Sequence, residues 1–378
     1  MESQRIIHRF FLSLWLILLP FWDLGAGLAL LLAFLAVVWR DRTAAKVKWL
    51  QSASFWPLWG IVAMIGIAGL WHESELETHL RVLPCMLLFW AFDRETIQKA
   101  LPLGGLILML YLLGSGAVRF LEGADFSTLL YRGLLEGLHQ HVYIGSYLLF
   151  AVVAVWTGRL GWRIKGLYTA LVLFFLGLLG AKMLILSTFL SVLWFVYHRG
   201  RLPAKAGWAG LLLVLGFVLT QAFSEGRALG HVLKPVNPYW ATGSVDTRVV
   251  QAQAAWRLIQ ERPWTGWGTV EKQAALDSRY TEMNYRFGMK RHLNVHNQFL
   301  EWALSYGLVG IGVLLLSWIV AFRLAPWEPF SLGLVLIYFG SLWLTESMME
   351  RSLGVSLFAL AWAWMVDQSK SQSSELDV

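Results

Sequence analysis

His296 is the residue of this chain best suited to acid–base chemistry. It stands in the stretch Arg291-His-Leu-Asn-Val-His-Asn-Gln, directly before a long apolar segment. Histidine changes its charge nearest to neutral pH, so it suits the removal of a proton from a hydroxyl group. Two other interpretations stay open: the ring caps a helix, or His292 and His296, four residues apart on one helix face, share a metal ion. No third metal ligand stands nearby, which disfavours a metal site.

The segment that leads to His296, residues 223–296, is unusually cationic. It contains six Asp and Glu but ten Lys and Arg, namely Arg227, Lys234, Arg248, Arg257, Arg262, Lys272, Arg279, Arg286, Lys290 and Arg291. This excess predicts an anionic ligand such as a phosphate or pyrophosphate, because arginine offers a planar fork of N–H donors. Contact with anionic lipid headgroups is the alternative.

Arg248 lies where a helix is expected to begin. Residues 244–259 read as a helix with Ser244 or Asp246 as its N-cap, and Pro263 and Gly266 end the helical stretch. Its predicted apolar stripe is Val249, Ala252, Trp256 and Ile259. Arg248 then falls in the first turn, where backbone N–H groups favour an anion. The alternative is that Arg248 pairs with Asp246 or with a lipid headgroup.

The stretch Pro263-Trp-Thr-Gly-Trp-Gly predicts a tight turn. Its tryptophans suit stacking on sugar rings, and they suit anchoring at a membrane surface equally well.

The composition indicates the scaffold that must position these residues. Of 378 residues, 57% are hydrophobic and only 15% are charged, against about 25% charged in soluble domains. Mean hydropathy is +0.56. Apolar segments suited to membrane spans fall near residues 9–22, 25–39, 53–71, 81–92, 101–120, 141–157, 166–180, 183–198, 207–222, 297–320, 329–345 and 352–367. The chain is therefore predicted to be an all-α integral membrane protein with about 12 transmembrane helices, of which those at 81–92 and 166–180 are short enough to be half-spans.

The distribution of charge predicts the orientation. The net charge of +7 comes largely from short basic connections between spans, which indicates membrane topology and argues against nucleic acid as a partner. Lys and Arg in short connections number about 16 on one side and about 5 on the other. Both termini are thus expected in the cytoplasm. The single cysteine, Cys85, excludes an internal disulfide and is expected to be a buried structural thiol.

Four regions follow from this topology. Residues 1–222 hold transmembrane helices 1–9, 223–296 form a large periplasmic loop, 297–367 hold helices 10–12, and 368–378 form a disordered cytoplasmic tail.

Ionisable residues at membrane depth mark functional sites, and three groups face the same side as the loop. One holds Arg132, Glu136, His139, His141 and Tyr143, the second is Lys182, and the third is the stretch Thr345-Glu-Ser-Met-Met-Glu-Arg351. We expect them to close one site with Arg248 and His296. Snorkelling explains Lys182 by itself, and a Glu350–Arg351 pair explains the third group by itself.

Several motifs, in this order, resemble the O-antigen ligase / O-antigen polymerase superfamily of bacterial envelope enzymes. They are Lys182 near the outer end of a span, Ser244-x-x-x-Arg248 with Trp256 and Pro263-x-x-Gly266-x-Gly268, then His296-Asn297-x-x-Leu300-Glu301 with Gly307-Leu-Val-Gly310, and Thr345-Glu-Ser-Met-Met-Glu-Arg351-x-x-Gly354. The resemblance covers about residues 138–358. It implies a C-type glycosyltransferase fold, in which a large periplasmic loop caps a cavity.

The resemblance also implies roles for single residues. Arg248 matches the loop arginine expected to bind the donor diphosphate, and His296 matches the histidine expected to activate the acceptor hydroxyl. Lys182 stands where many members carry arginine, so the charge is kept but bidentate recognition is lost. Supporting positions without an assigned role are Glu346, Arg351, His139 and Asn297.

The implied activity is that of an O-antigen ligase in the bacterial inner membrane. Its partners would be an undecaprenyl-diphosphate-linked glycan as donor, lipid A–core as acceptor, and membrane lipids. Cations on the leaving group and a base on the attacking hydroxyl suffice for an inverting transfer without a cofactor. The sequence lacks a D-x-D motif, which disfavours a metal. Alternatives are an O-antigen polymerase or a protein O-oligosaccharyltransferase of the same superfamily, and, from another class, a transporter or flippase.

Overall fold

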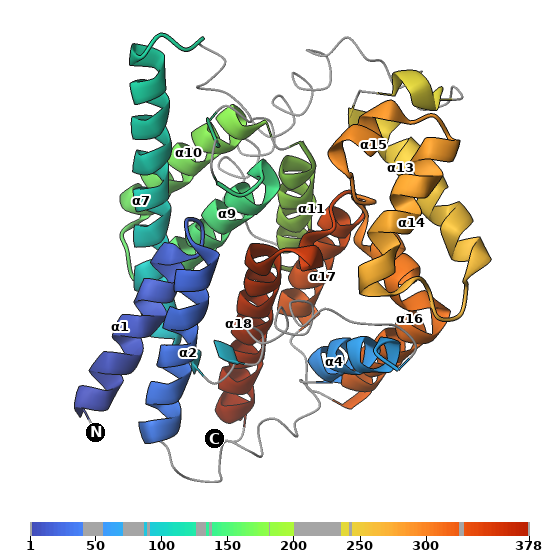
Figure 1. Cartoon of the computed structure of the whole chain (residues 1–378). Helices are drawn as coiled ribbons and strands as arrows, with labels where there is room; N and C mark the ends of the chain where they lie inside the picture. Colours follow the sequence, from blue (N-terminus) through green and yellow to red (C-terminus); the bar gives the residue numbers. More distant parts are fainter. Residues whose placement is uncertain are drawn as a thin grey trace. The chain divides into compact units, whose positions relative to one another are not determined.

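The computed structural model describes residues 2–40, 56–70, 87–88, 91–125, 134–135, 138–180, 182–199, 236–241, 244–324 and 329–376, and all their regular structure is helical (Figure 1). This confirms the all-α prediction for that part of the chain. The chain divides into two compact units. The first consists of Met1–Ala44, Pro84–Gln221 and Ser352–Asp367, and the second of Ala45–Leu83, Ala222–Arg351 and Gln368–Val378.

The first unit is a bundle of long apolar helices. Its elements are α1 (Glu2–Leu18), α2 (Asp23–Arg40), α7 (Arg94–Leu121), α9 (His141–Thr157), α10 (Trp162–Leu179), α11 (Lys182–Arg199) and the first part of α18 (Ser352–Leu376). Helix α1 packs on α2 and α7, and α9 packs on α7, α10 and α11. Neutral donors link these helices through backbone carbonyls: the Tyr147 hydroxyl donates to Leu16 O at 2.6 Å.

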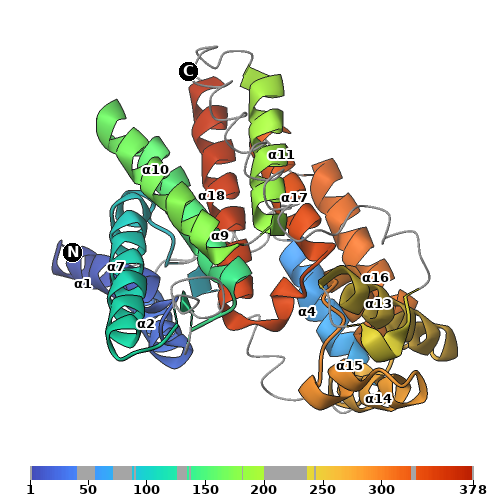
Figure 2. The ribbon, with the colours of Figure 1, turned by 90° about the horizontal axis from the view of Figure 1, so that it is seen from above.

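The second unit surrounds one long helix, α16 (Gln298–Leu324), with the helices of the loop that precedes it. Its other elements are α4 (Trp56–Ala68), η5 (Pro238–Trp240), α13 (Ser244–Glu261), α14 (Gly268–Glu282), α15 (Arg286–Arg291), α17 (Pro329–Trp343) and η6 (Met348–Glu350). Figure 2 shows α4 lying beside α16, with α13, α14 and α15 gathered near it. Residues 244–291 thus form a packed helical layer.

Helix α13 is amphipathic, but its buried face differs from the predicted stripe. The buried residues are Val250, Gln251, Ala254, Ala255, Leu258 and Ile259. Of the four predicted residues only Ile259 belongs to this face, and Trp256 is 56% exposed. The packing partners explain the shift, because small alanines allow α13 to approach α14 and α16 closely, whereas the bulky indole is turned outward. Helix α13 begins with Ser244 and has Asp246 in its first turn, so neither of these predicted residues is the N-cap.

The turn predicted at Pro263–Gly268 is present and attaches the loop to α16. Leu308 N donates to Pro263 O at 2.8 Å, and Trp267 N donates to Leu304 O at 2.7 Å. These bonds form where α16 is interrupted at Gly307, whose φ of 63° and ψ of −171° break the helical path. A Cβ at Gly307 would overlap the carbonyl of Trp264, so this contact requires glycine on steric grounds as well.

The helices fit a membrane protein. Within the part of the chain that the structure describes, three helices are long and apolar enough to cross a membrane: Arg94–Leu121, Trp162–Leu179 and Gln298–Val320. Shorter apolar helices are Asp23–Trp39, His141–Thr157 and Ser352–Asp367. The segment 166–180, predicted to be short, belongs to the full-length helix α10. The described residues do not include the predicted span at 207–222, nor Arg132, Glu136 and Cys85. The total of about 12 spans stays a prediction.

The chain after Asp367 was predicted to be disordered, and that prediction is wrong for its described part, residues 368–376. Helix α18 continues to Leu376. Polar residues extend a helix readily when an apolar segment has already nucleated it, because each further residue adds a hydrogen bond at low cost.

Candidate active site

His296 occupies a short connection between α15 and α16. Its backbone has φ of 52°, and His292, the C-cap of α15, has φ of 47°. Two left-handed residues turn the chain sharply, so the two histidines do not share a helix face, and the arrangement considered for a shared metal ion is wrong. His292 Nδ1 contacts Asp277 Oδ2 at 2.7 Å, whereas His296 Nδ1 contacts Glu346 Oε2 at 3.3 Å. Among the described residues, no three His, Cys, Asp or Glu side chains are grouped to hold a metal.

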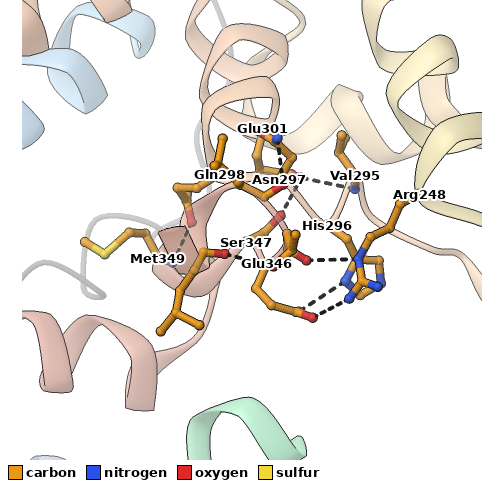
Figure 3. A network of polar contacts seen from close by, with 12 residues as sticks. Arg248, Val295, His296, Asn297, Gln298, Glu301, Glu346, Ser347 and Met349 are labelled. Atoms are coloured by element: carbon orange, nitrogen blue, oxygen red, sulfur yellow. Dashed lines mark hydrogen bonds and ion pairs between the residues drawn. The ribbon is translucent and has the colours of Figure 1, made fainter. Parts of the chain in front are cut away.

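The Glu346 carboxylate joins His296 to Arg248. Arg248 donates from Nη2 to Glu346 Oε1 at 2.9 Å and from Nε to Thr345 O at 3.2 Å. Figure 3 shows both side chains directed at the same carboxylate. We call Arg248, His296 and Glu346 the His296 cluster. Arg248 belongs to the start of the second turn of α13 rather than to the first, and it reaches a glutamate far away in the sequence.

The three side chains of the His296 cluster differ in how far they are exposed to solvent. The Glu346 side chain is 5% exposed, while those of His296 and Arg248 are 23% and 32% exposed. The carboxylate is therefore buried behind two groups that solvent or a substrate can reach. Because an ionised carboxylate only accepts hydrogen bonds, Nδ1 of His296 must carry the proton in this contact. In the neutral ring Nε2 is then the basic nitrogen, and a base oriented by a carboxylate can take a proton from a hydroxyl.

The start of α16 holds the turn that carries Glu346. Asn297 Nδ2 donates to Leu344 O at 3.0 Å, and Asn297 Oδ1 accepts from Leu300 N at 3.0 Å. Gln298 Oε1 accepts from Met349 N at 2.7 Å. Asn297, predicted to be a supporting residue, thus caps α16 and fixes one end of the 344–350 turn at the same time.

A second charged cluster lies on the same turn, and the sequence analysis did not identify it. Lys272 Nζ of α14 contacts Glu301 Oε1 at 2.7 Å and Glu350 Oε2 at 3.0 Å. We call these three residues the Lys272 cluster. Burial alone would lower the pKa of Lys272, but the two carboxylates outweigh burial, so the pKa lies above its ordinary value and the ammonium stays charged. Glu350, for which a pair with Arg351 was the alternative explanation, thus contacts Lys272.

Comparison with known families bears on this constellation. The family model described as O-antigen ligase matches residues 142–315. Residues 142–315 are therefore similar to the O-antigen ligase family. This match confirms the suggested resemblance at the level of the superfamily. Members of this superfamily are glycosyltransferase-like enzymes, ligases and polymerases. A search of curated proteins returned no match.

The segment that matches the O-antigen ligase family model contains most of the two clusters. Arg248, His296, Lys272 and Glu301 lie within residues 142–315, whereas Glu346 and Glu350 lie beyond the matched segment. Residues from outside the match therefore complete both clusters in space.

Two predicted site residues belong to the first compact unit. Lys182 is the first residue of α11. His139 precedes α9, and its Nε2 lies 3.3 Å from Asp23 Oδ1, at the start of α2. Lys182 lies within the matched segment and His139 just before it. The role of Lys182 towards the donor diphosphate and the supporting position of His139 stay predictions.

Arg351 belongs to the second unit and has an exposed side chain directly after η6. A specific role for Arg351 also stays a prediction.

The tryptophans of the predicted turn differ from one another. The Trp267 indole donates to Leu258 O at 2.9 Å and packs against the core of the loop, with the Arg262 guanidinium 4.1 Å from its ring centre. Trp264 is 67% exposed. Of the two rings, Trp264 has the larger open surface for a sugar or a lipid.

Proposed function

We propose that this protein is an O-antigen ligase, which transfers a glycan from undecaprenyl diphosphate to lipid A–core. The carrying observation is the Glu346 carboxylate that contacts both His296 Nδ1 and the Arg248 guanidinium. One buried anion thereby holds a base beside a cation, which are the two groups that displacement of a lipid diphosphate needs.

The proposed reaction is a direct displacement. His296 Nε2 takes the proton from an acceptor hydroxyl, and that oxygen attacks the anomeric carbon of the donor. The new C–O bond forms as the bond to the diphosphate breaks, and the electron pair leaves on the diphosphate. Attack from the face opposite the leaving group inverts the anomeric centre.

Arg248 is proposed to meet the charge on the leaving diphosphate. A guanidinium has five N–H donors in a planar fork, so it can be shared between a carboxylate and a diphosphate oxygen. Glu346 in turn stabilises the imidazolium that forms on His296. Lys182, in the first unit, stays a predicted donor-binding residue.

The proposal includes a location. The protein would lie in the inner membrane with both termini in the cytoplasm, and residues 223–296 would form a periplasmic loop over the site. The excess of Lys and Arg in that segment supports an anionic donor there.

The test is reconstitution with purified substrates. Wild-type protein in detergent, with EDTA present, is given undecaprenyl-diphosphate-glycan and lipid A–core, and products are separated on a gel. We expect a ladder on lipid A–core, which His296→Ala and Arg248→Ala both abolish. His292→Ala is the matched control, because its ring pairs with Asp277 away from the His296 cluster, and it should leave activity unchanged.

Other outcomes identify the alternatives. Longer lipid-linked chains with unmodified lipid A–core would indicate a polymerase, and transfer to a protein acceptor would indicate a protein O-oligosaccharyltransferase. Loss of product with EDTA that added metal restores would overturn the metal-independent mechanism. Absence of any transfer by folded protein would favour a transporter.

A further inference from the structure

The Lys272 cluster is buried more deeply than its chemistry alone would favour. The side chains of Lys272 and Glu301 are only 10% and 1% exposed, and that of Glu350 is 20% exposed. Removing such charges from water is costly, and well-packed apolar side chains of similar volume often give equal or greater stability. Stability by itself is therefore a weak explanation for this cluster.

The second oxygen of Glu301 points to another role. While Oε1 binds Lys272, Oε2 accepts from Val295 N at 3.3 Å and from the Ser347 hydroxyl at 3.3 Å (Figure 3). Val295 directly precedes His296, and Ser347 directly follows Glu346. The Glu301 carboxylate thus binds the residue before His296 and the residue after Glu346.

The backbone at His296 needs such support. Its φ of 52° is a left-handed conformation, which a residue with a side chain adopts only at a cost and keeps only when its surroundings impose it. The bond from Val295 N to Glu301 lies at the entry to this residue. Glu301 therefore constrains the direction in which the His296 ring leaves the backbone.

We propose that Glu301, held by Lys272, is a positioning residue that sets the contact between His296 and Glu346. The inference rests on the proposed function, in which that contact orients the base. Glu301 touches neither substrate nor reacting atoms in this scheme, and it acts through the backbone at Val295 and the side chain of Ser347.

Only a carboxylate serves both sides of Glu301. Oε1 faces an ammonium, and Oε2 faces an amide N–H and a hydroxyl, so both oxygens must accept. In Glu301→Gln the amide NH2 group meets a donor whichever way it turns. The substitution leaves the side-chain volume nearly unchanged, but it removes a contact either with Lys272 or with Val295 N.

The first measurement separates kcat from KM for glycan transfer. Because small displacements of a reacting group cost up to about 100-fold in rate, we expect Glu301→Gln to lower kcat by about 10- to 100-fold. The donor KM should change by less than about threefold, since donor binding is assigned to Arg248. Glu271→Gln is the matched control, because Glu271 is adjacent to Lys272 on α14 but forms an exposed pair with Arg262, and it should leave kcat unchanged.

The second measurement does not depend on activity. With ¹⁵N-labelled histidine, the Nδ1–H proton of a ring bound to a carboxylate gives a downfield NMR signal. Nine histidines are present, so the His296 signal is assigned by its loss in His296→Gln. We expect this signal to move upfield or broaden in Glu301→Gln and in Ser347→Ala, and to stay in place in Glu271→Gln.

These readouts distinguish the two proposals. If wild-type protein transfers no glycan but the His296 signal follows Glu301, the proposed function fails and the positioning role stands. An unchanged His296 signal and an unchanged kcat in folded Glu301→Gln would overturn the positioning role. A loss of kcat that only matches a loss of folded protein, with the signal in place, would also overturn it. Ser347→Ala removes a single hydroxyl, so it keeps the test valid if Glu301→Gln does not fold.

Discussion

Two charged clusters of the second unit are built alike, each from a loop helix, the region where α16 begins and the 344–350 turn, and they differ chiefly in burial. In each, a loop helix supplies a cation, Arg248 from α13 or Lys272 from α14, and the 344–350 turn supplies a carboxylate, Glu346 or Glu350. The third member comes from the start of α16 or from just before it. Arg248 and His296 stay partly exposed, whereas Lys272 and Glu301 are almost fully enclosed.

The comparison indicates that the partly exposed His296 cluster can take part in the reaction, whereas the enclosed Lys272 cluster can only support it. A substrate can reach the cation and the imidazole of the His296 cluster, and a planar arginine suits a shared anion. The Lys272 cluster closes on itself, with a compact ammonium between two carboxylates. Substitutions in the His296 cluster should therefore act on activity directly, whereas those in the Lys272 cluster should act on stability and reach activity only through the position of His296.

The largest effect is expected from Lys272→Met. It leaves the carboxylates of Glu301 and Glu350 together in a buried site, and breaking a buried pair by removing one partner costs about 3–5 kcal/mol. Denaturant unfolding in detergent measures the loss. Arg262→Met, which breaks an exposed pair with Glu271, should cost at most about 1 kcal/mol from that pair. Equal losses in the two variants would contradict the contrast between the clusters.

Glu346→Gln should next separate activity from stability. The amide keeps the volume but loses the charge that orients and stabilises the His296 imidazolium, so kcat should fall about 100-fold. Unfolding should change little, because Arg248 is partly exposed and water can solvate it. Glu282→Gln, on an exposed side chain of α14, is the control for the change of residue type. A large loss of stability in Glu346→Gln with unchanged kcat would invert the assignment of the two clusters.

A third variant acts on the scaffold beneath both clusters. Gly307→Ala forces a side chain into a backbone with φ of 63° and against the Trp264 carbonyl, and such strain costs about 1–3 kcal/mol from the backbone alone. Gly312→Ala is the control, because a Cβ there meets no atom within 4 Å. The melting temperatures of the two variants compare them directly. Equal values would mean that the contact between the Pro263–Gly268 turn and α16 contributes little.

The smallest effect is expected from Arg248→Lys. The charge is kept, but the planar fork shared between Glu346 and the donor diphosphate is lost, so the donor KM should rise about tenfold. Arg257→Lys changes an exposed residue of the same helix and should leave KM unaltered. Steady-state rates at varied donor concentration measure both variants. An unchanged KM in Arg248→Lys would remove Arg248 from the donor site.

Much of the candidate site was predictable residue by residue. His296 was identified from its chemistry and its place before an apolar segment, and Arg248 from its place near the start of a helix in a cationic loop. Glu346 was identified only as a supporting position of a motif, and its contact with both residues was not predicted. The alternating apolar and polar stretches predicted helices, and the described part of the chain is helical.

Other predictions failed because they depended on packing. The buried face of α13 depends on which helices cover it, and four apolar residues at helical spacing did not reveal that Ala254 and Ala255 face the core. His292 and His296 are spaced for one helix face, but two left-handed residues separate them. Lys272 was counted only as one of ten cations, and Glu301 only as a motif residue.

The sequence by itself determined the class of the protein and the chemistry available to it. Composition and apolar segments depend on each residue's own preference for lipid or water, so they can be read without a partner. Which carboxylate meets which cation was decided by the tertiary structure, because the pairs are separated by 29 to 98 residues along the chain. Contacts at that distance form only when α13, α14, α16 and the 344–350 turn pack together, and packing also decides which cluster a substrate can reach.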